Sequence, residues 1–264
     1  MDGADLDCWS AVAAGWAEFW GGFPEPAWSA VAQASGIGPG SRVLDVGCGS
    51  GELLAYLDRL GASTAGVDPA PGMIEVARAR ATGADIRLGR AEQLPWPDGE
   101  FDLVTSFNAL QFADDVLDAL TEFVRVAAPG GLVAISNWAE AARNDLNTIE
   151  DAVAYAAGEQ PRPIGGLWQP GGLGELLGAG GLDVVSAGLV EVPWHAPDDD
   201  ALVRGVLLGE DPATMATAAP TVIAAARRFR TPPGGYRLVN AFRYAVGRTP
   251  GDAFESRVGT MGEA

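Results

Sequence analysis

The sequence predicts an α/β fold with a doubly wound, Rossmann-like sheet of seven strands, mostly parallel with an antiparallel last strand and helices on both faces. Two observations carry this prediction. Short apolar segments alternate with amphipathic ones over residues 42–136, as in a parallel sheet with crossover helices. Residues 43–51, VLDVGCGSG, have the composition of a buried strand that ends in a glycine-rich turn directly before a helix.

The glycines of this turn are Gly47, Gly49 and Gly51, and such a unit usually holds a nucleotide-type cofactor. A dinucleotide fingerprint would need glycine at position 52, which is Glu52. A carboxylate there suits the helix dipole but repels a pyrophosphate. We therefore expect a cofactor without a phosphate at this turn. Asp45, two residues before the first glycine, could pair with a cationic amino group of that cofactor.

The second predicted strand covers residues 63–67 and is followed by Asp68. Asp68 lies 21 residues after Gly47, where a doubly wound fold places the carboxylate that binds a ribose diol. The alternative interpretation of an aspartate before Pro69 is a helix N-cap. A helix is expected from about residue 70 to 80 and carries Met73.

The pattern DxGxGxG at residues 45–51 resembles the first motif of the class I S-adenosylmethionine (SAM)-dependent methyltransferases. The resemblance continues motif by motif over about residues 37–138, and by topology to the last strand. It is to the broad ubiquinone/menaquinone-type subgroup, which also includes natural-product tailoring enzymes. It implies SAM as the cofactor and in-line transfer of its methyl group to an oxygen, nitrogen or carbon atom of a small molecule.

Residues 89–102 resemble the second motif of that family, in which an acidic residue and the next backbone N–H contact the adenine. Here Arg90 holds the acidic position, and arginine cannot accept a hydrogen bond from the adenine amino group. The backbone N–H of Ala91 could still serve the ring nitrogen, and Glu92 is the candidate acceptor. The adenine end is therefore where we expect the site to depart from the family.

The fourth predicted strand, residues 101–106, ends near the switch point of the sheet, where strand ends line the ligand cleft. Phe107 could pack on the adenine or face the sulfonium, whose charge attracts an aromatic ring. Phe112 is expected in the core. The residues expected to contact the cofactor are Asp45, Gly47, Cys48, Gly49, Gly51, Asp68, Pro69, Met73, Ala91, Glu92, Ser106, Phe107 and Gln111.

Aromatic-rich segments outside the predicted sheet are candidates for a lid. Residues 1–36 form the first, and insertions at about 139–168 and 196–232 form the others, within one domain over residues 1–264. The alternative for the first segment is an amphipathic helix that only packs against the domain. The residues expected to contact the acceptor are Trp16, Trp20, Asn108, Trp138 and Trp168.

The sixth predicted strand covers about residues 182–192. The only histidine, His195, follows it and is the candidate general base for an oxygen acceptor. The alternative interpretation is that His195 is a solvent-exposed histidine in a loop. We expect no metal, because metal-assisted methylation of catechols needs acidic ligands at the ends of the fourth and fifth strands. Those positions hold Ser106, Phe107, Asn108, Ser136 and Asn137.

The net charge of −18, with 17 arginines and no lysine, disfavours nucleic acid and anionic membranes as partners. A small molecule is therefore the expected partner. The oligomeric state stays open, and a homodimer is one possibility. An acidic N-terminal stretch and the lack of a long apolar run lead us to expect a cytoplasmic protein.

Three other functions remain open. Relatives of this kind can use the SAM pocket for a non-methylating reaction such as cyclisation. The chain could also be a non-catalytic SAM-binding subunit. The third, a dinucleotide dehydrogenase, is disfavoured by Glu52.

Overall fold

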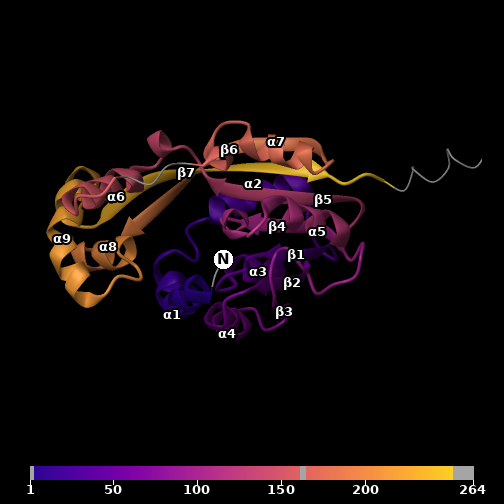
Figure 1. Ribbon diagram of the computed structural model, residues 1–264, viewed down its shortest axis with the longest axis horizontal. Helices are drawn as coiled ribbons and strands as arrows, with labels where there is room; N and C mark the ends of the chain where they lie inside the picture. The colour runs from indigo at the N-terminus through magenta and orange to yellow at the C-terminus, as the bar shows by residue number, and fades with distance from the viewer. Residues whose placement is uncertain (1–2, 161–164, 252–264) are drawn as a thin grey trace, which may run out of the picture.

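The computed structural model describes residues 3–160 and 165–251, so residues 161–164 of the first insertion lie outside it. Its centre is a seven-stranded sheet in the order β3-β2-β1-β4-β5-β7-β6 (Figure 1). β7 is antiparallel to β5 and β6, and the other neighbouring pairs are parallel. The predicted fold class is confirmed. The strands are β1 (Arg42–Val46), β2 (Ser63–Asp68), β3 (Asp85–Leu88), β4 (Phe101–Phe107), β5 (Ala127–Trp138), β6 (Asp183–Ala196) and β7 (Tyr236–Arg248).

Helices cover both faces of the sheet, because successive side chains of a buried strand point to opposite faces. On one face Leu44 packs with residues of α5 and α7, and on the other Val43 packs with residues of α2 and α3. The helices are α1 (Gly3–Phe19), α2 (Glu25–Ser35), α3 (Glu52–Arg59), α4 (Pro71–Arg80), α5 (Val116–Val126), α6 (Asp145–Ala156), α7 (Gly172–Ala179), α8 (Asp199–Val206) and α9 (Pro212–Ala226).

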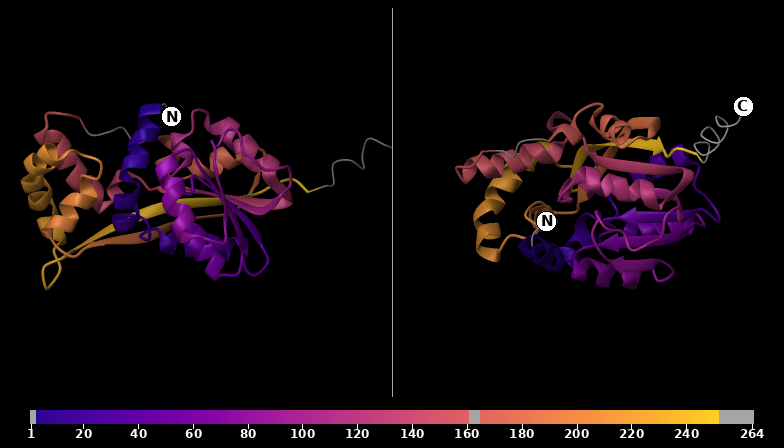
Figure 2. Two further views of the ribbon diagram at one scale, coloured as in Figure 1. Left: turned by 90° about the horizontal axis from the view of Figure 1, so that it is seen from below. Right: turned by 45° about the vertical axis from the view of Figure 1, so that its right-hand side comes forward.

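The strands β6 and β7 run beyond the rest of the sheet and carry a helical layer. This layer, the helical cap, consists of α6, α8 and α9, which gather at the far end of the β6–β7 pair (Figures 1 and 2). The sequence predicted that β6 ends near residue 192, but it continues to Ala196 and pairs with β7 throughout. Trp194 and Tyr236 from these extensions pack with Leu202 and Val222 of the cap. The two predicted insertions therefore form one layer.

The N-terminal helix α1 stands between the helical cap and the sheet (Figure 2). Near the middle of α1, Ser10 Oγ accepts a hydrogen bond over 3.2 Å from the backbone N–H of Gly72, in the first turn of α4. At its C-terminal end the Trp20 indole N–H donates to the Gly205 carbonyl over 3.0 Å. The Trp194 indole N–H donates to the Phe19 carbonyl over 2.6 Å. α1 is thus held to α4 on one side and to the cap on the other.

Gly72→Ala is expected to displace α1 and to lower the free energy of unfolding by about 1–3 kcal/mol, the usual cost of overpacking. A Cβ at Gly72 would lie 2.4 Å from the Ser10 carbonyl oxygen. The matched control is Gly174→Ala in α7, where a Cβ would meet nothing within 4 Å. Thermal unfolding measures both variants. A Gly72→Ala protein as stable as Gly174→Ala would contradict the close seating of α1 on α4.

Within the described residues, no helix has both the length and the apolar character needed to cross a membrane.

Candidate functional site

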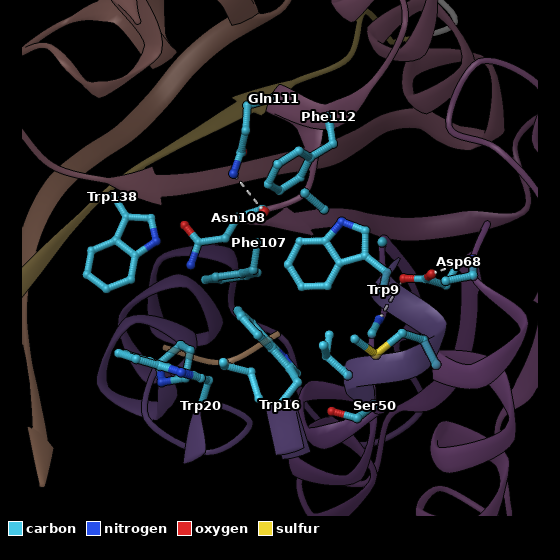
Figure 3. A pocket seen from close by; sticks show the side chains of 18 of the residues that line it. Trp9, Trp16, Trp20, Ser50, Asp68, Phe107, Asn108, Gln111, Phe112 and Trp138 are labelled. Atoms are coloured by element: carbon cyan, nitrogen blue, oxygen red, sulfur yellow. Dashed lines mark hydrogen bonds between the residues drawn. The ribbon is translucent and has the colours of Figure 1, made fainter. Parts of the chain in front are cut away.

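A cavity of about 850 Å³ lies at the carboxyl ends of β1, β2 and β4. Its floor is the glycine turn after β1, and α1, α6 and the end of α8 line the side opposite the sheet. Figure 3 shows the side chains that converge on it. The site therefore lies where open α/β sheets bind their ligands, at the edge formed by the strand ends.

Asp45 is a buried carboxylate in the cavity wall, 3% exposed. Its Oδ1 accepts a hydrogen bond from Thr105 Oγ1 over 2.8 Å. Burial raises the pKa of Asp45 to about 7 and the charge of Asp68 adds to this, while the Thr105 hydrogen bond lowers it. A carboxyl group with this pKa changes charge near neutral pH, and a cation placed beside it would favour the ionised form.

The three glycines of the turn have positive φ angles of 76°, 51° and 85°, and they serve different purposes. A Cβ at Gly47 would lie 2.1 Å from Ala109 Cβ, so the loop after β4 can approach only a glycine. At Gly49 the nearest atom is Trp16 Nε1 at 4.0 Å, which places the α1 indole across from the turn. At Gly51 a Cβ would lie 2.9 Å from Ala77 Cα. Gly51 thus packs against α4 and does not line the cavity, unlike the other residues predicted to contact the cofactor.

Asp68 ties the glycine turn to the start of α4. Its Oδ2 accepts from the Gly49 N–H over 3.0 Å, and its Oδ1 accepts from the Ala70 N–H over 2.9 Å. Burial raises its pKa, and the two backbone N–H groups oppose the rise. The helix-capping alternative is wrong, because the N-cap position is Ala70 and no side chain caps α4. Its carboxylate also lines the cavity, where it could bind a diol.

The carboxylate of Glu52 lies beside the turn and is paired. Ser50 Oγ donates to it over 2.7 Å, and Arg80 forms an ion pair with it. Arg80 also donates to the Ser50 carbonyl over 2.7 Å. This pairing offsets part of the negative charge, so the repulsion of a pyrophosphate is weaker than the sequence alone suggests.

At the predicted adenine end, Arg90 joins two loops. It pairs with Asp114 in the loop after β4, and its Nε lies 3.6 Å from Glu92 Oε2. The other oxygen of Glu92 accepts from the Asp114 backbone N–H over 2.6 Å. Arg90, Ala91 and Glu92 all line the cavity. The predicted acceptor Glu92 is therefore already engaged with its own protein, and its contact with an adenine stays a prediction.

The loop after β4 begins with Asn108, whose φ of 52° is the only positive value at a described non-glycine residue. Its N–H donates to the Ser136 carbonyl over 2.9 Å, and its carbonyl accepts from Gln111 Nε2 over 2.8 Å. Its side-chain Oδ1 is buried and makes no hydrogen bond among the described residues. Ser106, in contrast, uses its hydroxyl to donate to the Val46 carbonyl over 2.9 Å.

A continuous series of aromatic rings lines the cavity. The ring centroids of Trp9 and Trp16 are 5.4 Å apart, those of Trp16 and Trp20 are 6.4 Å apart, and those of Trp20 and Trp138 are 6.3 Å apart. Trp9 was not predicted as a site residue, although its spacing of seven from Trp16 puts both on one helix face. Phe112 was wrongly predicted in the core: it is 42% exposed and packs edge-on against Trp9 at 5.6 Å.

The charged side chains of the cavity wall are mostly acidic. Eight carboxylates and one guanidinium, that of Arg90, line it among the described residues. Sequence reasoning missed those that α6 contributes, because nothing local showed which face of this insertion helix would turn toward the cavity. The eight are Asp45, Glu52, Asp68, Glu92, Glu150, Asp151, Glu159 and Glu210.

All five residues predicted to contact the acceptor line the cavity, but the predicted base His195 does not. It lies on β6 between Trp194 and Ala196, which are both buried, and the alternation of the strand turns its side chain to the exposed side. The structure thus assigns His195 no place in the site. Among residues 3–160 and 165–251, no three histidine, cysteine or acidic side chains gather to form a metal site.

Comparison with known proteins identifies the domain. Residues 44–135 match the family model described as a methyltransferase domain. The malonyl-[acyl-carrier protein] O-methyltransferase of Serratia marcescens is 36% identical over 122 residues, which cover 46% of this chain and 47% of that protein. These matches support a class I SAM-dependent methyltransferase domain over residues 44–135. An uncharacterized protein of Mycobacterium tuberculosis is 39% identical to the chain over 109 residues, 40% of each protein. The chain thus spans less than half the length of these relatives.

Solved structures show the same methyltransferase fold over most of the chain. A putative methyltransferase from Bacillus halodurans superposes with a TM-score of 0.59 at 17% identity, and covers 84% of this chain and 98% of that one. The [4+2]-cyclase SpnF gives a TM-score of 0.56 at 18% identity, and covers 85% and 80%. At such identities the likeness concerns the fold alone.

Several groups of the cavity could hold SAM, the cofactor of this family. Asp45 offers a carboxylate for the amino group, and Asp68 offers one for the ribose diol. Gly49 leaves the space between the turn and Trp16 free of a side chain. The fit is weakest at the adenine, where Arg90 replaces the usual acidic residue.

Proposed function

We propose that this protein transfers the methyl group of SAM to a small-molecule acceptor, such as an intermediate of natural-product biosynthesis. One observation carries the proposal: Asp45, the glycine turn and Asp68 line the same cavity as the aromatic series that ends at Trp138. A polar part formed by these carboxylates and the turn, and an aromatic part formed by the rings, thus share one cavity. A transfer between two bound molecules requires such an arrangement. When bound, SAM supplies an electrophilic methyl group on a sulfonium centre.

The residues of the chain contribute binding, orientation and exclusion of water. Asp45 binds the amino group of the cofactor, and Asp68 binds its ribose while it keeps the glycine turn in place. Trp16 and Phe107 present rings toward the region between the compartments, where a ring face favours a cation (Figure 3). α1 and the helical cap limit the access of water. Because the methyl group is already activated, positioning of this kind accounts for much of the catalysis.

A transfer assay with methyl-labelled SAM tests this function. The protein is incubated with a panel of amines, phenols and carboxylic acids, and we expect label in at least one product. The rate should be unchanged in a chelator, since the ends of β4 and β5 offer the neutral side chains Ser106, Asn108 and Asn137. SAM binding without transfer to any member of a broad panel would argue for cyclisation-type chemistry or for a non-catalytic subunit.

A further inference from the structure

We propose that the acceptor is an amine carried by an apolar or aromatic body, and that the side-chain oxygen of Asn108 holds its N–H. This inference rests on the proposed function, because it names the acceptor of the same cavity. Three independent features support it: an unpaired hydrogen-bond acceptor, a set of aromatic rings and the sign of the charge around them.

The backbone of Asn108 is held in place. Hydrogen bonds to Ser136 and Gln111 fix its backbone on both sides, in a left-handed conformation that few non-glycine residues adopt. Such outliers gather at binding sites, where the surrounding structure maintains them. Its Oδ1 is buried and has no partner in the part of the chain that the structure describes, and leaving a buried acceptor unsatisfied costs free energy. A rotation of the amide that brings this oxygen to the N–H of a bound ligand would remove that cost.

Aromatic rings surround this side of the cavity. In Figure 3 the Asn108 amide projects on the side of Trp138, with Phe107 and Trp20 nearby and Asp68 on the opposite side. Phe107 and Trp138 pack into one cluster, and Trp20 lies 6.3 Å from Trp138 between ring centroids. These rings accommodate an apolar or aromatic body, and their faces attract a cationic nitrogen.

The charge of the wall excludes anionic acceptors. Asp151 of α6, Glu159 and Glu210 line the cavity on the side of the helical cap. The one guanidinium in the described wall, Arg90, lies at the predicted adenine end and is paired with Asp114. A carboxylate or phosphate would therefore find no counter-charge beside the aromatic rings, whereas an ammonium group would be attracted to the cavity mouth.

The set of titratable groups favours nitrogen over oxygen as the nucleophile. A hydroxyl acceptor must lose its proton to a base, and no histidine, lysine or tyrosine is among the described residues of the wall. The other candidate bases there are carboxylates, and a carboxylate is a weak base toward a hydroxyl group. Burial raises the pKa of the Cys48 thiol well above its usual value, which keeps it protonated. Asp45 lies at the cofactor end. A neutral amine needs no base, because its own lone pair is available.

The transfer balances for an amine. A proton carried by the ammonium form leaves to water at the cavity mouth. The nitrogen lone pair then forms the N–C bond while the C–S bond of the methyl donor breaks. The positive charge moves from sulfur to nitrogen, and the aromatic faces and carboxylates stabilise it in both positions.

Binding measurements test the inference apart from turnover. The protein is saturated with S-adenosylhomocysteine and titrated by calorimetry with benzylamine, benzyl alcohol and benzoate, which share a ring and differ in charge. We expect benzylamine to bind roughly tenfold more tightly than benzyl alcohol, the effect of a cation over aromatic faces, and benzoate to bind least. Tighter binding of benzyl alcohol or benzoate would overturn the proposal.

Two variants of Asn108 test its role. Asn108→Gly retains the backbone conformation, and we expect it to weaken benzylamine binding about 3- to 12-fold through the lost hydrogen bond. Asn108→Asp keeps the accepting oxygen and should bind benzylamine at least as tightly as the wild type. Equal losses in both variants would contradict an accepting role. Asp151→Asn should weaken the binding of benzylamine but not that of benzyl alcohol.

The outcomes separate this inference from the proposed function. If S-adenosylhomocysteine does not bind, the proposed function itself is wrong. If it binds, and labelled methyl groups appear only on phenols or carboxylic acids, the methyltransferase assignment stands and the amine acceptor is wrong.

Discussion

Asp68→Ala is expected to weaken SAM binding by about 1.5–3 kcal/mol, the cost of losing a charged hydrogen-bond partner. The carboxylate lines the cavity at the end of β2, and its oxygens also accept from the Gly49 and Ala70 N–H groups. The variant therefore removes the proposed cofactor contact and a support of the glycine turn together. Calorimetric titration with SAM measures the loss.

The matched control for this variant is Asp85→Ala at the start of the neighbouring strand β3. Asp85 is exposed, pairs with Arg87 and does not line the cavity. Its substitution should leave SAM affinity unchanged. Asp68→Asn keeps one accepting oxygen for the turn, so it should bind SAM more tightly than Asp68→Ala. If Asp68→Ala remains folded and binds SAM like the wild type, the ribose is not at Asp68.

SAM affinity is expected to fall about fivefold as the pH decreases from 7 to 6, because Asp45 then gains a proton. Burial raises the pKa of Asp45 to about 7 in the ligand-free protein. The amino group of the cofactor favours the ionised carboxylate, so binding near neutral pH releases a proton from Asp45. Asp45→Asn should bind SAM more weakly at pH 7.5 and lose little further affinity between pH 7 and 6.

Thermal unfolding of the ligand-free protein provides a second test of Asp45. Its pKa in the fold, about 7, lies above its value in the unfolded chain. The protonated group therefore favours the fold at low pH, and this contribution is lost as the pH rises through 7. Asp45→Asn should thus be stabilised relative to the wild type at pH 8 and differ little at pH 4. If neither the melting temperature of the wild type nor its SAM affinity changes with pH, Asp45 does not titrate between pH 4 and 8.

The sequence was sufficient to predict the sheet because the relevant signals are local. Buried strands, helix faces and the turn between Gly47 and Gly51 are each encoded within about ten residues. The length of β6 was underestimated because Pro193 and the turn-forming residues near it suggested an end. Pairing with β7, which begins 40 residues after Ala196, extends the strand to that residue.

The site was predictable where a residue belongs to a motif and unpredictable where tertiary packing decides. The places of Asp45 and Asp68 in the cavity wall could be predicted because both residues lie near the carboxyl ends of predicted strands. Gly51 looked like a cofactor contact, but α4 occupies its open side. His195 lies after the predicted end of a strand and is in fact inside it, on the exposed side. Phe112 was predicted in the core because it is a large apolar residue. No sequence signal shows that it lies at the cavity, where it packs against Trp9 of α1.

The most direct test of the account is a pair of calorimetric titrations of the wild-type protein, one with SAM and one with NAD. The cavity is lined by Asp45, proposed to bind the amino group, by the glycine turn beside Glu52, and by Asp68, proposed to bind the ribose. We predict that SAM binds with one molecule per chain and that NAD does not bind measurably. Tighter binding of NAD, or no binding of SAM by a folded protein, would contradict the assignment of this cavity.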